Sequence, residues 1–392
     1  MNKFFITIKT ALFVSASVSL LILLGCGGGS VNTNPSGQKN PLDEYKTLSI
    51  LYGDPHVHTN LSDGDESPDF AIRYARDTIG LDWVSITDHV EYLAKSSPAI
   101  IEYYRSLPQK FDNPGKFCVL YGYEWTSISY GHRNVYTLDS NIPLLSCEDP
   151  RWNTIEKFWD ALKGHDVITV PHHTIMHSNH SWTKKRNPGV EVAIEFYSKW
   201  GNSLSTSELR QLPNPYPPNS VLSGLVKEGL RYGLIAGTDT HMSRPASVLR
   251  ESRQKDAIEY AQPGITGVWA TSHTREGIYN GIKNRHTYGM TGTKLMLMFS
   301  VNNRIMGNEI SSNSAPVITF RVESPVVISR IAILKISDGK INEIKEFHPN
   351  ALILEGDFTD TQFTGDSAYL LRVELVNTDM ALCSPVWVKY IS

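Results

Sequence analysis

Cysteine, net charge and long apolar runs are all scarce in this chain of 392 residues. Three of its 4 cysteines, Cys118, Cys147 and Cys383, are scattered without any CxxC pair, so a disulfide framework is not expected. Lys and Arg number 37 against 40 for Asp and Glu, and the formal charge of -3 offers no basic excess for binding a polyanion. No nucleic-acid partner is therefore expected.

The fourth cysteine, Cys26, follows an apolar run near the N-terminus. Residues 10–24 are apolar but too few to span a bilayer comfortably, which is typical of an export signal. The letters Leu-Leu-Gly-Cys at 23–26 resemble a lipobox, where the signal is removed before a lipid-carrying cysteine. The pattern predicts a signal peptide at 1–25, a flexible tether at 26–45, and an exported chain anchored through lipid on Cys26 to a bacterial membrane, periplasmic or on the cell surface. An ordinary signal peptide or a short anchor helix is the alternative.

Apolar runs alternate with helical patterns over the next part of the chain. Ser67 and Pro68 supply an N-cap and a first-turn proline for a helix over 69–79, which Gly80 ends, and a second helix is expected over 153–163. The expected strands are 46–53, 82–87, 117–122, 134–138, 166–170, 190–197 and 234–237. This alternation predicts an α/β domain over 46–292, built on a parallel barrel or sheet.

Past residue 291 the pattern changes to short alternating strands separated by Asn, Ser, Asp and Gly. The expected strands here are 295–302, 317–322, 328–336, 369–376 and 386–391. We therefore expect residues 293–392 to form a small all-β, immunoglobulin-like sandwich.

Histidine is unusually concentrated, because most of the 13 histidines fall between Asp54 and His241. Together with Asp and Glu they follow the expected strand ends, where catalytic groups of parallel barrels meet. The residues in question are His56, His58, Asp88, His89, Glu124, His172, His173, Asp239 and His241. Imidazole and carboxylate are ligands for Zn, Mn or Fe, so the clustering indicates a metal site.

The order of these motifs resembles the PHP (polymerase and histidinol phosphatase) superfamily. The matching stretches are DPHVHT at 54–59, SDG at 62–64, ITDH at 86–89, GYE at 122–124, GHRN at 131–134, PH at 171–172 and GTDTH at 237–241. The resemblance implies a distorted seven-stranded TIM-like barrel with two to three divalent ions, Zn, Mn or Fe. The ligands that it implies are His56, His58, Asp63, His89, Glu124, His132, His172, Asp239 and His241.

The family pattern also implies how these ligands divide among the ions. One ion would take His56, His58, Glu124 and Asp239, a second Asp63, His89 and His241, and a third Glu124, His132 and His172. Glu124 would bridge, and His173 is an alternative to His172.

Further stretches at 195–198, 274–292 and 384–388 resemble a two-domain branch of uncharacterised PHP phosphoesterases, and also metallohydrolases that cleave carbamate esters such as carbaryl. The chemistry expected from the resemblance is hydrolysis of a small-molecule ester by a metal-bridging hydroxide. Asp239 is the candidate to move the proton of the attacking water, and His177 or His241 to protonate the leaving group. Arg133 is the candidate to clamp a phosphate or carboxylate, or else forms a surface ion pair.

Three functions fit this pattern. A metal-dependent phosphoesterase acting on small phosphoesters is the first, and a carbamate or carboxylic ester hydrolase with the same metals is the second. The third is a metal-bearing binding module that uses its C-terminal sandwich to engage a partner. Asp88 and Glu195 are expected to orient ligands rather than bind metal.

Overall fold

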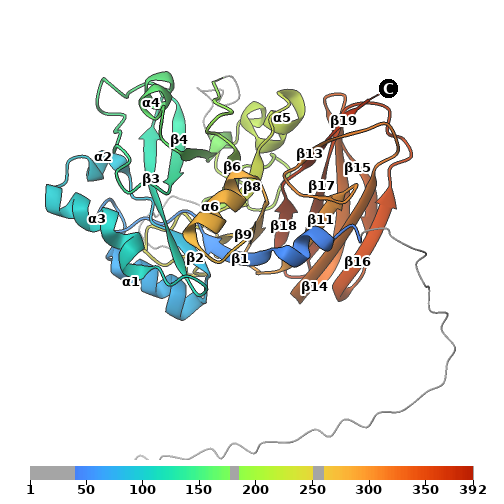
Figure 1. Ribbon diagram of the computed structural model, residues 1–392, viewed down its shortest axis with the longest axis horizontal. Coiled ribbons are helices and arrows are strands. Elements are labelled where there is room, and N and C mark those ends of the chain that lie inside the picture. Colours follow the sequence, from blue (N-terminus) through green and yellow to red (C-terminus); the bar gives the residue numbers. More distant parts are fainter. Residues whose placement is uncertain (1–39, 177–184, 250–259, 392) are drawn as a thin grey trace, which may run out of the picture. The chain divides into compact units, whose positions relative to one another are not determined.

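Strands and helices alternate along the first two thirds of the chain, as the apolar pattern predicts. The computed structural model describes residues 40–176, 185–249 and 260–391 (Figure 1), all within one compact unit. Within these ranges, no helix is long and apolar enough to cross a membrane. The expected signal peptide lies outside the described residues. The last part of the expected tether is folded, because the 3-10 helix η1 (Asp43–Thr47) buries Tyr45, whose hydroxyl donates to the carbonyl of Phe299 at 2.8 Å.

All seven strands expected in the first domain are present, and three further ones accompany them. The ten strands are β1 (Ser49–Asp54), β2 (Trp83–Ser85), β3 (Cys118–Ser127), β4 (Gly131–Thr137), β5 (Val167–His172), β6 (Ala193–Ser198), β7 (Gly201–Asn202), β8 (Gly233–Ala236), β9 (Gly264–Ala270) and β10 (Thr287–Thr291). β1, β2 and β3 are parallel neighbours, as are β6 and β8. β4 is antiparallel to both β3 and β5, so β5 still runs in the direction of β3.

These strands curl into a ring. One ladder runs β10-β9-β1-β2-β3-β4-β5, and a second, shorter sheet contains β7, β6 and β8. β6 contacts β5, and β8 contacts both β9 and β10, so the second sheet fills the space between the two ends of the first. A single bridge between Val57 and Thr240 joins the segments that follow β1 and β8. The carboxyl ends of β1, β2, β5 and β8 therefore meet at one edge of the ring.

Helices connect these strands, and the predicted caps are found in place. They are α1 (Pro68–Arg73), continued by the π-helix η2 (Tyr74–Ile79), then α2 (Val90–Leu93), α3 (Pro98–Phe111), α4 (Ile155–Ala161), η3 (Thr174–Met176), η4 (Pro217–Asn219), α5 (Val221–Lys227) and α6 (Arg275–Lys283). The Ser67 hydroxyl accepts from the amide of Phe70, and Gly80 ends the helix at a φ of 66°. Thr154 caps α4, and Gly164 follows it at a φ of 87°.

The C-terminal part is all β. Its strands are β11 (Met296–Val301), β12 (Arg304–Ile305), β13 (Glu309–Ser312), β14 (Val317–Ser337), β15 (Lys340–Phe347), β16 (Ala351–Thr359), β17 (Ser367–Leu375), β18 (Met380–Cys383) and β19 (Val386–Tyr390). β14 joins two strands that were expected separately, and Figure 1 shows it beside β16 and β17, to which it is hydrogen-bonded. β18 pairs with β10, so the main sheet continues from the α/β part into the all-β part.

Candidate metal centre

Four buried ligand atoms meet where the ends of β1, β3 and β8 converge. Nε2 of His56 lies 3.2 Å from Oε2 of Glu124, from Oδ1 of Asp239 and from Nε2 of His58. Nε2 of His58 lies 3.2 Å from the same Glu124 oxygen and 3.1 Å from the same Asp239 oxygen. Five of the six distances between these four atoms are thus nearly equal. We call His56, His58, Glu124 and Asp239 the central group.

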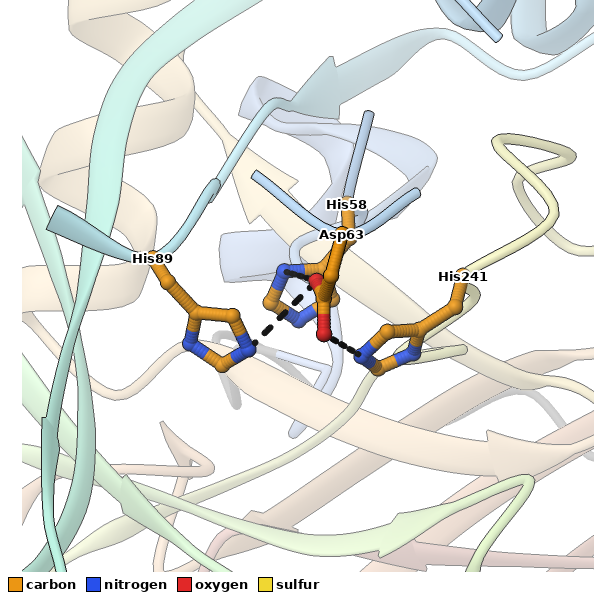
Figure 2. Close-up of side chains that lie close together, drawn as sticks. All are labelled: His58, Asp63, His89 and His241. Atoms are coloured by element: carbon orange, nitrogen blue, oxygen red, sulfur yellow. Dashed lines mark ion pairs between the residues drawn. The ribbon is translucent and has the colours of Figure 1, made fainter. Parts of the chain in front are cut away.

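A second group lies at the mouth of the first and is more exposed. Figure 2 shows Asp63 between the rings of His58, His89 and His241. The Asp63 carboxylate is 3.9 Å from Nδ1 of His58, 3.6 Å from Nε2 of His89 and 3.5 Å from Nε2 of His241. His58 thus faces the central group with one ring nitrogen and Asp63 with the other. We call these four residues the outer group.

The third group uses the second oxygen of Glu124. Oε1 of Glu124 lies 3.0 Å from Nδ1 of His132 and 3.4 Å from Nε2 of His172. His132 and His172 are cross-strand partners on β4 and β5, and His132 also pairs with Thr126 on β3. Because β4 runs antiparallel to β3 and β5, its ligand His132 lies at the beginning of the strand, whereas His172 is the last residue of β5. We call Glu124, His132 and His172 the lateral group.

The electrostatics of these groups favour bound cations. Burial alone would raise the pKa of Glu124, but the charges of His89 and His172 and hydrogen bonds from the lateral histidines hold that pKa well below its usual value. Burial would likewise raise the pKa of Asp239, but the charge of His56 and hydrogen bonds from neighbouring imidazoles hold it low. The carboxylates therefore stay ionised. Burial would lower the pKa of His56, but Asp239, Glu195 and Glu124 raise it well above its usual value, so a metal ion would bind there in exchange for the imidazole proton.

The side chains of the central group are held by partners outside it. Nδ1 of His56 lies 3.1 Å from Oε2 of Glu195 on β6, which leaves Nε2 for the central group. Oδ2 of Asp239 lies 2.6 Å from Nε2 of His173, which leaves Oδ1 for the centre. His173 and Asp239 both adopt positive φ, 50° and 54°, a backbone conformation that orients each side chain toward the other. Gly237 permits the contact between Glu195 and His56, because a Cβ at residue 237 would lie 2.6 Å from an atom of each side chain.

The loop that carries Asp63 is fixed by Asp88. One oxygen of the Asp88 carboxylate accepts from the Thr59 amide and the Ser62 hydroxyl, and the other accepts from the Thr59 hydroxyl, each at 2.6 Å. Asp88 thus orients a ligand-bearing loop, as expected. Asp54 does the same on the other side of His56, because it accepts from the amides of His56 and Thr238.

The donor set fits divalent metal ions. A regular tetrahedron with edges near 3.2 Å places each corner about 2.0 Å from its centre, which is the length of a Zn–N or Zn–O bond. Nδ1 of His58 and Nδ1 of His172 are buried without a hydrogen bond among the described residues. Such orphaned imidazole nitrogens are costly unless a bound ion satisfies them, and Nδ1 of His58 and Asp63 would hold such an ion in the outer group.

A cavity of about 250 Å³ opens onto the three groups. One wall consists of ligands from all three groups together with His173. The rest of the lining, which we call the apolar wall, consists of Met176, Trp200, Leu212 and Pro213. Among the described lining residues there is no Lys or Arg, so a bound anion would meet positive charge only on the ligand side.

The structure brings together all nine residues that the sequence proposes as metal ligands. It does not bring Arg133 to them: this buried side chain pairs with Glu191 at 2.6 Å and donates to the carbonyl of Tyr130. The reason is strand alternation, since His132 already faces the centre and its neighbour on β4 must point the other way. The expected clamp thus has no geometric support. Arg133 does form an ion pair, the alternative to the clamp, but this pair is buried and not at the surface. His177 lies outside the described residues.

Two residues of the site have roles that the sequence did not predict. His173 was an alternative ligand in the sequence, and the structure shows it lining the cavity and contacting the ligand Asp239. Trp200 donates its indole N–H to the carbonyl of Asp239 at 3.0 Å and packs edge-on against His241. Nothing in the local sequence distinguishes Trp200 from the chain's other tryptophans.

Comparisons with known proteins place this chain among uncharacterised relatives. Residues 225–319 match a family described as "Protein of unknown function (DUF3604)". An uncharacterized protein from Chlamydia pneumoniae is 23% identical over 87% of this chain. Two further Chlamydia proteins, from C. trachomatis and C. muridarum, are 24% and 22% identical over 86%. The chain spans 57% of the length of these curated relatives.

Solved structures give a related result. A two-domain protein from Bacteroides vulgatus, described as containing a predicted PHP-like metal-dependent phosphoesterase, matches over 88% of this chain and 96% of its own, with 16% identity and a TM-score of 0.46. The lesion-specific endonuclease EndoQ from Pyrococcus furiosus matches over 60% of this chain and 56% of its own, with 13% identity and a TM-score of 0.38.

Proposed function

We propose that this chain is a multinuclear metal-dependent hydrolase, and that its substrates are small phosphoesters. The observation that carries the proposal is the central group, in which two imidazoles and two carboxylates present their ligand atoms at nearly equal spacings of 3.1 to 3.2 Å. Glu124 extends this centre to a neighbouring group through its second oxygen. Such sharing is typical of centres in which adjacent ions act on one substrate.

Divalent ions held there would supply Lewis acidity, lowering the pKa of water and polarising the ester. His56, His58, Glu124 and Asp239 would hold the central ion, and the outer and lateral groups would hold the others. Asp239 keeps one oxygen in the centre and the other on His173. That contact offers a proton from the attacking water a path away from the centre. Of the two candidates for protonating a leaving group, His241 lies within the described residues, and it lines the cavity.

Charge balance favours an anionic ester. The three groups contain three carboxylates, those of Asp63, Glu124 and Asp239. Three divalent ions would exceed their negative charge by about three, and two ions by about one. A phosphoester placed against this wall would therefore meet a net positive charge, even without a lysine or arginine beside it.

A second candidate is a carbamate or carboxylic ester hydrolase. The apolar wall of Met176, Trp200, Leu212 and Pro213 favours it, because an uncharged ester gains from apolar contact and needs no basic clamp. Both reactions use the same ligands, so only a choice of substrates separates them.

The deciding experiment uses soluble chain beginning at residue 27. Hydrolysis rates are measured for three nitrophenyl substrates, a phosphomonoester, a phosphodiester and a carbamate. Each is tested with Mn or Zn and with chelator, and Glu124→Gln is the control variant. We expect chelator-sensitive phosphoester turnover that falls by about 100-fold or more in the variant, since both Glu124 oxygens contact ligands. Selective carbamate cleavage would support the second candidate. No turnover by a chain shown to contain metal would contradict both and favour a binding module.

We further propose that the natural substrate is a small molecule rather than nucleic acid, and that the chain is tethered through lipid on Cys26. A cavity of about 250 Å³ and the formal charge of -3 support the first point. The lipobox-like letters at 23–26 support the second. Incorporation of labelled palmitate that is lost in Cys26→Ser tests the anchor.

We also infer that the ring of strands is the distorted seven-stranded barrel expected from the resemblance, and that the all-β part is an immunoglobulin-like sandwich. Closure of the ring by β6 and β8 supports the first inference. The antiparallel pairing of β14 with four other strands supports the second.

A further inference from the structure

The apolar wall of the cavity belongs mainly to one closed loop. Residues 200–213 leave the ring after β6 and return to their starting point, where the amide of Asn202 donates to the carbonyl of Arg210 at 2.7 Å. Gly201 adopts a φ of 137°, and a Cβ there would lie 2.8 Å from the amide nitrogen of Leu212. The two ends of the loop are therefore pinned together. We call residues 200–213 the wall loop.

The two ends of the wall loop face the ligands. Trp200 is at one end, and Leu212 and Pro213 are at the other, and all three line the cavity. The indole of Trp200 is oriented by its hydrogen bond to the Asp239 carbonyl, so its ring has a fixed position beside the ligands. Met176 adds a flexible thioether to the same wall. A fixed indole, a proline and a thioether together suit a flat aromatic group.

The tip of the wall loop is held by the all-β part of the molecule. Glu208 accepts two hydrogen bonds from the guanidinium of Arg372 on β17, at 2.7 and 2.8 Å. Arg210 lies 3.2 Å from the carboxylate of Asp379 and donates to the hydroxyl of Thr291 at 2.9 Å. Three of these four charged side chains are less than a tenth exposed, so the pairs are sheltered from solvent screening.

We propose that the wall loop is the specificity element of this hydrolase, that it selects esters bearing an aryl group, and that the all-β part determines this selectivity by holding the loop through Arg372 and Asp379. This inference rests on the proposed function, because it names the substrate class of the same site. The reacting ester lies on the ligand wall, and its aryl group lies against Trp200. Trp200 is a specificity residue, whereas Arg372 and Asp379 are positioning residues.

The first test measures binding and does not depend on turnover. Phenylphosphonate and methylphosphonate, which cannot be hydrolysed at phosphorus, are titrated calorimetrically into the Mn-loaded chain. We expect phenylphosphonate to bind about 10-fold or more tightly than methylphosphonate, because the ring leaves water for an apolar wall. Trp200→Ala should remove most of this preference, measured as the ratio of the two affinities, so that any shared effect through Asp239 or His241 cancels. Equal binding of the two phosphonates by the wild-type chain would overturn the proposal, as would an unchanged preference in Trp200→Ala.

The second test addresses the all-β part. Arg372→Gln should lower the affinity for phenylphosphonate by about 5-fold or more without changing that for methylphosphonate. The exchanged pair Glu208→Arg with Arg372→Glu should restore part of the loss. The matched control is Arg321→Gln, because Arg321 pairs with Glu355 on the same all-β part, at 2.9 Å, but does not touch the wall loop.

The outcomes separate the two proposals. An aryl preference that depends on Trp200 and Arg372, in a chain that hydrolyses no ester, would uphold the wall loop and contradict the hydrolase. Chelator-sensitive ester hydrolysis without any aryl preference would do the reverse. Equal loss of both phosphonates in Arg372→Gln and Arg321→Gln would assign Arg372 a merely structural role and overturn its part in selectivity.

Discussion

At the scale of single residues, positions after strands pointed to seven of the nine residues that the structure brings together, and the family resemblance added Asp63 and His132. Their partners were harder to predict, because a contact such as that between His173 and Asp239 depends on two residues with positive φ in separate loops. Arg133 was left open between a clamp and an ion pair, although alternation along its strand pointed to the face away from the metal groups. The assignment of His132 as a ligand already implied that its neighbour Arg133 points away from the metal groups.

His286 lies outside the metal groups and provides a pH-dependent test. Burial, and then the charge of Arg285, lowers the pKa of His286 from 6.5 to about 4. The unfolded chain therefore binds this proton more tightly, and the stability due to neutral His286 is lost as the pH falls from about 6.5 toward 4. When the pH is lowered from 7 to 5, the unfolding free energy of the wild-type chain should fall by about 2 kcal/mol more than that of His286→Gln. Urea unfolding of both metal-free proteins measures this, and parallel pH profiles would contradict it.

At the scale of elements, caps and periodicity predicted helices and seven strands well. The strands β9 and β10 were missed because their glycines resemble turn signals in sequence, whereas in the fold they allow close packing. A Cβ at Gly267 would lie 2.4 Å from the ring of Tyr288, and one at Gly264 would lie 2.0 Å from the Gly237 carbonyl. β15 and β16 were missed because charged and polar residues interrupt their apolar pattern, and none of their side chains is fully buried.

The loop held by Asp88 gives a prediction at this scale. Asp88→Asn would retain one acceptor oxygen, while its new amide would face hydroxyl and amide donors of the loop. The loop should then release Asp63 from the outer group, while the central and lateral groups keep their ligands. We expect the variant to bind about one metal ion fewer per chain, measured by elemental analysis after dialysis. Ser96→Ala is a control, because that exposed hydroxyl bonds only to the Tyr92 carbonyl in α2. Unchanged metal content in Asp88→Asn would contradict this assignment.

At the scale of the whole molecule, the expected boundary at residue 292 stays a prediction. What the sequence did not indicate is that hydrogen bonding continues across it. β10 pairs with β18, and the amide of Ser384 donates to the carbonyl of Thr287 at 3.0 Å. Strands so distant in the chain leave no local signal of their pairing in the sequence. The pairing forms only when both parts of the chain bring their strands to the same sheet edge.

This continuity predicts cooperative unfolding. Phe320 is fully buried in the all-β part, so Phe320→Ala should lower the unfolding free energy by about 3 to 5 kcal/mol. If the two parts unfold together, hydrogen exchange should accelerate equally for amides of β1 and of β14. Mass spectrometry of peptides from both strands measures this. Faster exchange confined to the all-β part would show that the two parts unfold separately.

The two walls of the cavity have different origins in the chain, and this has a consequence for how such a protein can diversify. The ligand wall is supplied by strand ends of the ring, whereas the apolar wall is supplied mainly by a loop whose tip is fixed on another part of the molecule. Mutations in the ion pairs that anchor that loop can therefore accumulate without touching the ligands. A duplicated gene could acquire a new substrate range through these few sheltered ion pairs while inheriting its chemistry intact.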